Sequence, residues 1–254
     1  MRKLIAIAGK GGTGKTTLSA LLVRILARES ASLLAIDADP NNNLWQWLGL
    51  KRAGTVMDIV EDLSKNKDTM PHGMTKQNFI DLKVQESIEE CDRFDLLSMG
   101  RPEGPGCYCY ANNLLRGLIE KISKSYEIVI IDNEAGMEHL SRRLLLEIDL
   151  LFIISDFSVV GIRSAKNISS MPEKLGIKIK EKMFILNKAT ENIERLRGEI
   201  ERLGIEFAGF IPYDRNLDDI NIKGGSIFDM DENSQTFKAI ERIAHGFTER
   251  KVVK

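Results

Sequence analysis

The chain has 254 residues, of which 36 are Lys or Arg and 37 are Asp or Glu, so its formal net charge is −1. This length suits one α/β domain or two small ones, and the balanced charge argues against nucleic-acid binding as the main role. The three cysteines, an odd number, do not suggest a disulfide framework, and no apolar run approaches the roughly 20 residues that span a bilayer. The apolar start is too short for a signal peptide, so we expect a cytoplasmic protein without a membrane partner.

Apolar runs typical of strands alternate along the chain with helical periodicity, which predicts a doubly wound, mostly parallel α/β sheet of seven strands flanked by helices. We expect strands at Leu4–Ala8, Leu33–Asp37, Phe94–Met99, Ile128–Asp132, Leu150–Ser155, Met183–Asn187 and Phe207–Ile211. We expect helices at residues 15–29, 112–125, 138–147, 161–175, 190–203 and 233–247, with shorter helical pieces near 55–65 and 80–90. Without a linker or a repeat, residues 1–254 are predicted to form a single domain that is decorated by the more polar segment 51–92.

The first strand leads into residues 9–17, GKGGTGKTT, which match the phosphate-binding loop (P-loop) pattern Gly-x4-Gly-Lys-[Ser/Thr] between a strand and a helix. Glycines let successive N–H groups turn toward phosphate oxygens, and the start of the helix adds partial positive charge. Lys15 can then reach the outer phosphates while the Thr16 hydroxyl binds Mg²⁺. The pattern predicts a nucleoside triphosphate site formed by Gly9, Lys10, Gly11, Gly12, Thr13, Gly14, Lys15, Thr16 and Thr17.

A second lysine, Lys10, follows the first glycine, although an ordinary P-loop needs only one lysine. The segment resembles the deviant loop of the MinD/ParA-like ATPases, Lys-Gly-Gly-x-Gly-Lys-[Ser/Thr]. The resemblance implies a homodimer in which Lys10 reaches the nucleotide of the partner subunit. It also implies that the chain hydrolyses ATP to ADP and phosphate, with Lys10 and Lys15 as catalytic residues.

Two acidic segments end strands at the edge of the sheet where ligands collect. In the resembled family, the aspartate before the proline of Asp39–Pro40 lies in switch I and orients the attacking water. The segment Ile128–Gly136 resembles the Walker B and switch II pattern, in which Asp132 holds a Mg²⁺-bound water and the N–H of Gly136 senses the γ-phosphate. Asp37 is a further candidate for supporting Mg²⁺ through water.

A third strand end, Phe184–Lys188, supplies candidates for binding the base. In the resembled family, an asparagine at the position of Asn187 contacts adenine through its amide, which both donates and accepts hydrogen bonds. The later residues Pro212 and Tyr213 resemble the loop that closes over the base. We therefore expect Asn187, Lys188, Pro212 and Tyr213 in the adenine-binding part of the site.

Two cysteines, Cys107 and Cys109, lie in a loop rich in glycine and proline that follows a predicted strand. In extended backbone, side chains at i and i+2 point the same way, so the two thiolates can share a metal. One pair supplies only two of the four ligands of a structural zinc or similar thiolate site, and Cys91 stands alone. A two-fold dimer would supply four thiolates, and Lys10 independently implies a dimer.

Together, the P-loop, Asp39–Pro40, the Cys-Tyr-Cys segment and residues 132–142 resemble the CooC-type nickel-insertion ATPases, which mature carbon monoxide dehydrogenase, and relatives that serve acetyl-CoA synthase. The resemblance implies that the four cysteines of a dimer bind Ni²⁺ or Zn²⁺ and that ATP turnover accompanies delivery to the client enzyme. Two alternatives remain open. One is an electron-transfer ATPase like the nitrogenase iron protein, with an intersubunit iron–sulfur cluster; the other is a partitioning or positioning switch.

Overall fold

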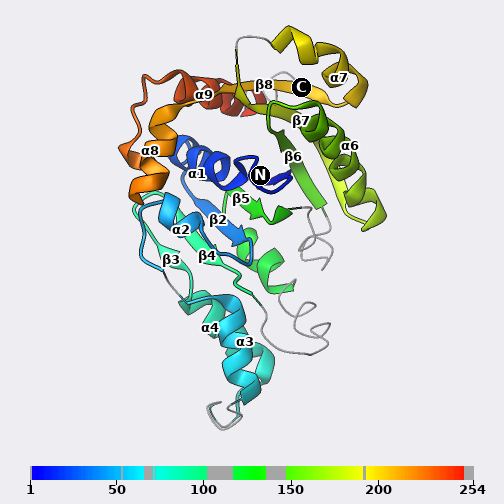
Figure 1. Ribbon diagram of the computed structural model, residues 1–254. Coiled ribbons are helices and arrows are strands. Elements are labelled where there is room, and N and C mark those ends of the chain that lie inside the picture. Colours follow the sequence, from blue (N-terminus) through cyan, green and yellow to red (C-terminus); the bar gives the residue numbers. More distant parts are fainter. Residues whose placement is uncertain are drawn as a thin grey trace.

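The structure is a computed structural model that describes residues 2–52, 54–65, 71, 73–101, 117–135, 147–190 and 193–248. Within these residues the centre is a sheet of eight strands in the order β3-β4-β2-β5-β1-β6-β7-β8 (Figure 1). The strands are β1 (Lys3–Gly9), β2 (Leu33–Ala38), β3 (Glu89–Glu90), β4 (Asp95–Ser98), β5 (Ile128–Asn133), β6 (Glu147–Ser155), β7 (Lys178–Ala189) and β8 (Glu206–Pro212). All neighbouring pairs are parallel except β3 with β4.

The seven predicted strands are present, and the prediction of seven in total is wrong by one short edge strand. Residues 89–90 were expected at the end of a helix, but they pair antiparallel with β4, Glu89 opposite Leu96 and Glu90 opposite Asp95. Two acidic residues give no apolar alternation from which a strand can be predicted. Cys91 consequently lies in the turn after β3, where it is half-buried, and not at a helix end.

The described helices account for most of the predicted ones. They are α1 (Lys15–Leu26), α2 (Leu44–Trp47), α3 (Val56–Lys65), α4 (Lys76–Glu86), α6 (Val159–Lys174), α7 (Arg197–Leu203), α8 (Arg215–Lys223) and α9 (Gln235–Thr248), with 3₁₀ turns η4 (Ile193–Leu196) and η5 (Ile227–Asp229); residues 117–123 are also helical. The predicted helix 138–147 lies outside the described residues except for Glu147, which begins β6 instead. The sequence did not predict α2 and α8, because α2 has four residues and α8 buries none of its side chains. No helix in the described ranges is long and apolar enough to cross a membrane.

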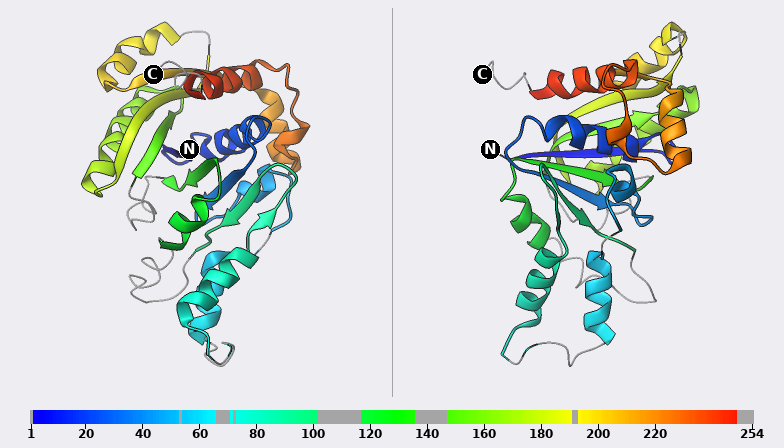
Figure 2. Two further views of the ribbon diagram at one scale, coloured as in Figure 1. Left: turned by 180° about the vertical axis from the view of Figure 1, so that it is seen from behind. Right: turned by 90° about the vertical axis from the view of Figure 1, so that its left-hand side faces the viewer.

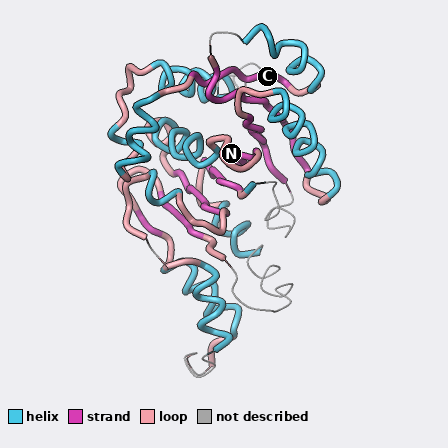
Figure 3. Tube along the Cα trace, viewed as in Figure 1, coloured by secondary structure: helices cyan, strands magenta, loops and turns pink. Residues whose placement is uncertain are grey.

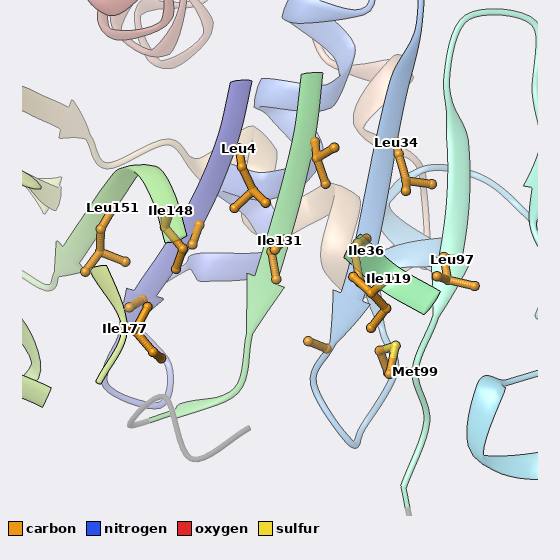
Figure 4. Close-up of a cluster of buried hydrophobic side chains, with 14 of the residues drawn as sticks. Leu4, Leu34, Ile36, Leu97, Met99, Ile119, Ile131, Ile148, Leu151 and Ile177 are labelled. Carbon is orange, nitrogen blue, oxygen red and sulfur yellow. The ribbon is translucent and has the colours of Figure 1, made fainter. Parts of the chain in front are cut away.

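The sheet is covered on both faces, as its nearly continuous apolar strands require. Along β1, Leu4 and Ala6 belong to one buried cluster, whereas Ile5 and Ile7 belong to the other, because successive side chains point to opposite faces. Helices α1 and α9 pack on one face, and α3, α4, α6 and residues 117–123 contribute to the cluster on the other (Figure 2, Figure 3). Figure 4 shows part of this second cluster, to which Ile119 and strand residues such as Ile36 and Ile131 belong.

This packing fixes where each strand ends. A slip of one residue would turn every buried side chain of a strand to the opposite face, and burying one Leu or Ile is worth about 1.5–3 kcal/mol. The register sets Asp132 of β5 beside Ile7 of β1 and beside Asp37 of β2. The acidic strand ends predicted from the sequence therefore lie next to the P-loop, which follows β1 directly.

Candidate nucleotide-binding site

A cavity of about 630 Å³ opens at the carboxyl ends of the parallel strands, within the usual range of about 300–1,000 Å³ for small-molecule sites. Predicted site residues that line it are Gly11, Gly12, Gly14, Lys15, Thr16, Thr17, Asp39, Asn187, Lys188, Pro212 and Tyr213. Gly9, Lys10, Thr13 and Asp132 adjoin it without being part of the lining. Gly136, Cys107 and Cys109 lie outside the described residues.

Two glycines of the P-loop have no room for a side chain. A Cβ on Gly9 would collide with the carbonyl oxygen of Ile154 in β6 and would lie 2.8 Å from Thr13 Oγ1. Gly14 adopts φ +93°, and a Cβ there would collide with Asn187 Nδ2. Glycine is therefore required at both positions, by close approach at Gly9 and by both approach and backbone conformation at Gly14.

The loop is closed around the carbonyl oxygen of Lys10. This oxygen accepts hydrogen bonds from Thr13 Oγ1 over 2.8 Å and from Lys15 Nζ over 3.4 Å. Burial lowers the pKa of Lys15, while the carboxylates of Asp132, Asp39 and Glu134 act in the opposite direction. Lys15 is thus a buried cation held at the floor of the cavity, where a phosphate would be its natural counter-charge.

The side chain of Lys10 behaves differently from that of Lys15. It is exposed, and its ammonium group forms no hydrogen bond or ion pair with any residue in the described ranges. Lys15 is buried in the same loop, with 7% of its surface exposed. The two lysines of the loop therefore face different surroundings, one the cavity and the other the solvent.

Asp132 is a buried acid beside the loop, with 1% of its surface exposed. Its Oδ1 accepts a hydrogen bond from Ser19 Oγ over 2.9 Å, whereas its Oδ2 is buried and has no hydrogen-bond partner among the described residues. Burial raises the pKa of Asp132 to about 6, against the lowering effect of the Thr16 and Ser19 hydroxyls and of Lys15. A buried oxygen without a partner, beside the Thr16 hydroxyl, is the arrangement that a hydrated Mg²⁺ would complete.

Asp37 is fully buried and anchors the loop after β2. Its Oδ1 accepts from the backbone N–H of Asp39 over 3.1 Å, and its Oδ2 accepts from that of Leu44 over 2.9 Å. Burial, followed by the charge of Asp132, raises its pKa to about 7. Because both oxygens already accept backbone hydrogen bonds, Asp37 is suited to shaping the loop more than to holding Mg²⁺.

Asp39 lines the cavity at the start of that loop. Its Oδ1 accepts from the backbone N–H and from the side-chain amide of Asn41, both over 2.9 Å. Its Oδ2 forms no hydrogen bond with any residue of the described ranges. The carboxylate is therefore held by one oxygen and leaves the other free to accept a hydrogen bond from water.

Asn187 is already hydrogen-bonded to backbone at both ends of its amide. Nδ2 donates to the Thr13 carbonyl over 2.8 Å, and Oδ1 accepts from the Lys188 N–H over 2.8 Å. The residue therefore connects β7 to the P-loop, and its second Nδ2 hydrogen and the second lone pair of Oδ1 remain for a base.

Several cavity residues were not singled out from the sequence: Trp47, Arg101, Leu217, Asp218 and Asn221. Arg101 follows Gly100 at the carboxyl end of β4, so the strand-end argument used for Asp39 also applied to it. The other four lie on α2 and α8, the two helices without a clear apolar pattern. Within the described ranges, no group of three or more His, Cys, Asp or Glu side chains is placed to hold a metal ion.

Comparison with known proteins extends these observations. Residues 4–227 match the family model of the CobQ/CobB/MinD/ParA nucleotide binding domain. The chain is 40% identical over 251 residues to an uncharacterized ATP-binding protein of Methanocaldococcus jannaschii, covering 98% of this chain and 99% of that one. It is 30% identical over 249 residues to the carbon monoxide dehydrogenase accessory protein CooC of Rhodospirillum rubrum, with 89% of each chain covered.

The fold is shared with solved structures as well. The MinD cell division protein of Aquifex aeolicus matches with a TM-score of 0.72 over 97% of both chains, at 23% sequence identity. The cavity, the P-loop and these similarities lead to one assignment. The chain belongs to the CobQ/CobB/MinD/ParA family of P-loop ATPases.

Proposed function

We propose that this protein is an ATP-dependent metallochaperone that delivers nickel to carbon monoxide dehydrogenase or to a related acetyl-CoA synthase. The observation that carries the proposal is the Cys107/Cys109 pair in a chain that is 30% identical to CooC over 89% of both lengths. ATP hydrolysis is the activity of the family. The cysteine pair adds candidate metal ligands, which a general switch ATPase does not need.

The ATP half of the proposal rests on the cavity. Lys15 and the N–H groups of the loop would bind the phosphates, and Thr16 with Asp132 would hold Mg²⁺ and its waters. Mg²⁺ bound there would neutralise charge on the phosphates. Asp39, with Oδ2 available in the cavity, would orient the attacking water by accepting its hydrogen bond.

The dimer half rests on Lys10. An ammonium group that is exposed beside a phosphate-binding loop, and without a partner in the described ranges, is free to bind a nucleotide of another subunit. We infer a homodimer that forms when ATP is bound. Such a dimer would bring two Cys-x-Cys loops to one axis and provide four thiolates, the number a closed thiolate site requires.

Metal stoichiometry under anaerobic conditions tests this proposal. Purified protein is dialysed against NiCl2 or ZnCl2, with and without a non-hydrolysable ATP analogue, and its metal content is measured. We expect about one tightly bound ion per dimer, and Cys107→Ser and Cys109→Ser should each abolish it. One ion per chain that survives both substitutions would contradict the shared site, and acid-labile sulfide with iron would favour the electron-transfer alternative instead.

Cys91→Ser is the matched control. Burial, followed by the charges of Glu89, Asp95 and Asp92, raises the pKa of Cys91 to about 11. The Cys91 thiol is therefore protonated at neutral pH and is a poor ligand, so its removal should leave metal binding unchanged. Transfer of nickel to the metal-free client enzyme, measured as its activation with and without ATP, then tests the delivery step.

A further inference from the structure

The cavity extends beyond the P-loop, over the first turn of α1, to the space between α2 and α8. The cavity-lining residues of α8 and of the loop before it are Asp214, Leu217, Asp218 and Asn221. Their spacing of three, four and seven residues places them on one face of the helix. One whole face of α8 therefore borders the cavity.

Packing against the rest of the protein does not explain why α8 is held in place. None of its side chains is buried, and Ile222 is 82% exposed. Ile220 packs only partly against the core, and so does Leu217 on the cavity-lining face. A nine-residue helix is marginal without tertiary contacts, so a ligand that fills the space under α8 would complete its packing.

Helix α2 forms the wall next to α8. A Cβ on Gly224, at the end of α8, would lie 3.6 Å from Gln46 Nε2, and Ser226 Oγ donates a hydrogen bond to the Trp47 carbonyl over 3.3 Å. Figure 1 shows the two helices side by side. The start of α2 is held by the hydrogen bond from the Leu44 N–H to Asp37, so the short helix has a fixed position.

The two tryptophans of the chain, Trp45 and Trp47, both lie on α2 and have different surroundings. Trp47 lines the cavity, whereas Trp45 does not, and the Trp45 indole N–H donates to the Asn42 carbonyl over 2.7 Å. Trp47 is half-buried, and in the described ranges its indole N–H has no hydrogen-bond partner. A flat, partly exposed indole in a cavity is a surface on which a heterocyclic base can stack.

We propose that Trp47 stacks on the base of the bound nucleotide, and that the inner face of α8 forms the opposite wall of this base site. The phosphates are fixed by the P-loop, so the base must lie elsewhere in the same cavity, and Trp47 is its largest aromatic surface. Tyr213, the other aromatic residue of the lining, donates its hydroxyl to Asp218 on α8 and so belongs to the α8 wall. This inference uses only the nucleotide binding of the family and is independent of the metal site.

The test compares a ligand that has a base with one that lacks it. Dissociation constants of ADP and of inorganic pyrophosphate are measured by calorimetry for the wild type, Trp47→Ala, Trp47→Phe and Trp45→Phe. We expect Trp47→Ala to weaken ADP binding about tenfold and to leave pyrophosphate binding unchanged, since only ADP loses a stacking partner. Trp47→Phe should retain most of the ADP affinity, and Trp45→Phe all of it.

Fluorescence provides a readout that does not depend on removing the Trp47 ring. In Trp45→Phe the only indole is Trp47, and ADP should change its emission whereas pyrophosphate should not. In Trp47→Phe the remaining Trp45 should be insensitive to both ligands. Equal loss of ADP and pyrophosphate affinity in Trp47→Ala, or a Trp47 signal that ADP does not alter, would overturn the proposal. ADP binding by the wild type would show that the nucleotide site itself still stands in that case.

Discussion

Asp37 and Asp132 stand opposite each other on the neighbouring parallel strands β2 and β5, and both carboxyl groups are buried. The two acids have different partners. Asp37 accepts backbone hydrogen bonds with both oxygens, whereas one oxygen of Asp132 is without a partner in the described ranges. One acid thus shapes the loop that carries Asp39, and the other remains available to a hydrated cation.

The pKa of Asp37 predicts a specific dependence of stability on pH in the absence of Mg²⁺ and nucleotide. Burial and the charge of Asp132 raise it from 3.8 to about 7, so the folded protein binds this proton more tightly than the unfolded chain does. The free energy of unfolding should therefore fall as pH rises from about 4 to about 7, by an amount on the order of 1–3 kcal/mol. Urea titrations across this range should show the slope in the wild type and a flatter profile in Asp37→Asn; identical slopes would contradict the assignment.

Asp132→Asn should separate stability from ligand response. The substitution removes a buried charge, so the nucleotide-free protein should unfold at the same or a higher temperature. It also removes the carboxylate that would hold the waters of Mg²⁺, so the rise in melting temperature caused by Mg²⁺ with ADP should be largely lost. Thermal unfolding with and without the ligands measures both effects. A variant that keeps the full Mg²⁺-dependent rise would show that Asp132 does not serve the cation.

Asp39 should act on turnover without acting on binding. Asp39→Ala removes a carboxylate of the cavity lining, and we expect ATP hydrolysis to slow at least tenfold while ADP affinity changes little. Asp39→Asn is the matched control for structure, because its amide oxygen can still accept the Asn41 N–H that shapes the loop. Steady-state ATPase assays should find both variants slow. Near wild-type rates in Asp39→Asn would assign Asp39 to loop structure alone.

The sequence predicted those parts of the fold and site whose signal is local. The P-loop glycines and lysines are consecutive, and the seven longer strands are continuous apolar runs. Trp47 and the cavity-lining residues of α8 were missed because contacts between distant segments position them. Ser226, which follows α8, donates a hydrogen bond to the Trp47 carbonyl from 179 positions away, and Gly224 at the end of α8 lies next to Gln46 of α2. No periodicity within α2 or α8 encodes those contacts.

Lys10 should be required for the dimer and dispensable for binding within one chain. Lys10 is exposed and lies outside the cavity lining, whereas Gly11, Gly12, Gly14, Lys15 and Thr16 form part of it. Lys10→Ala should therefore keep ADP affinity within about threefold of the wild type but remain monomeric with ATP, since the lost charge would act on the partner's phosphates. Light scattering coupled to size exclusion, with ATP or ADP present, measures the state of assembly. Lys15→Ala is the contrasting variant, because it should lose nucleotide affinity and dimerisation together; a Lys10→Ala dimer of wild-type strength would make Lys10 an ordinary solvated lysine.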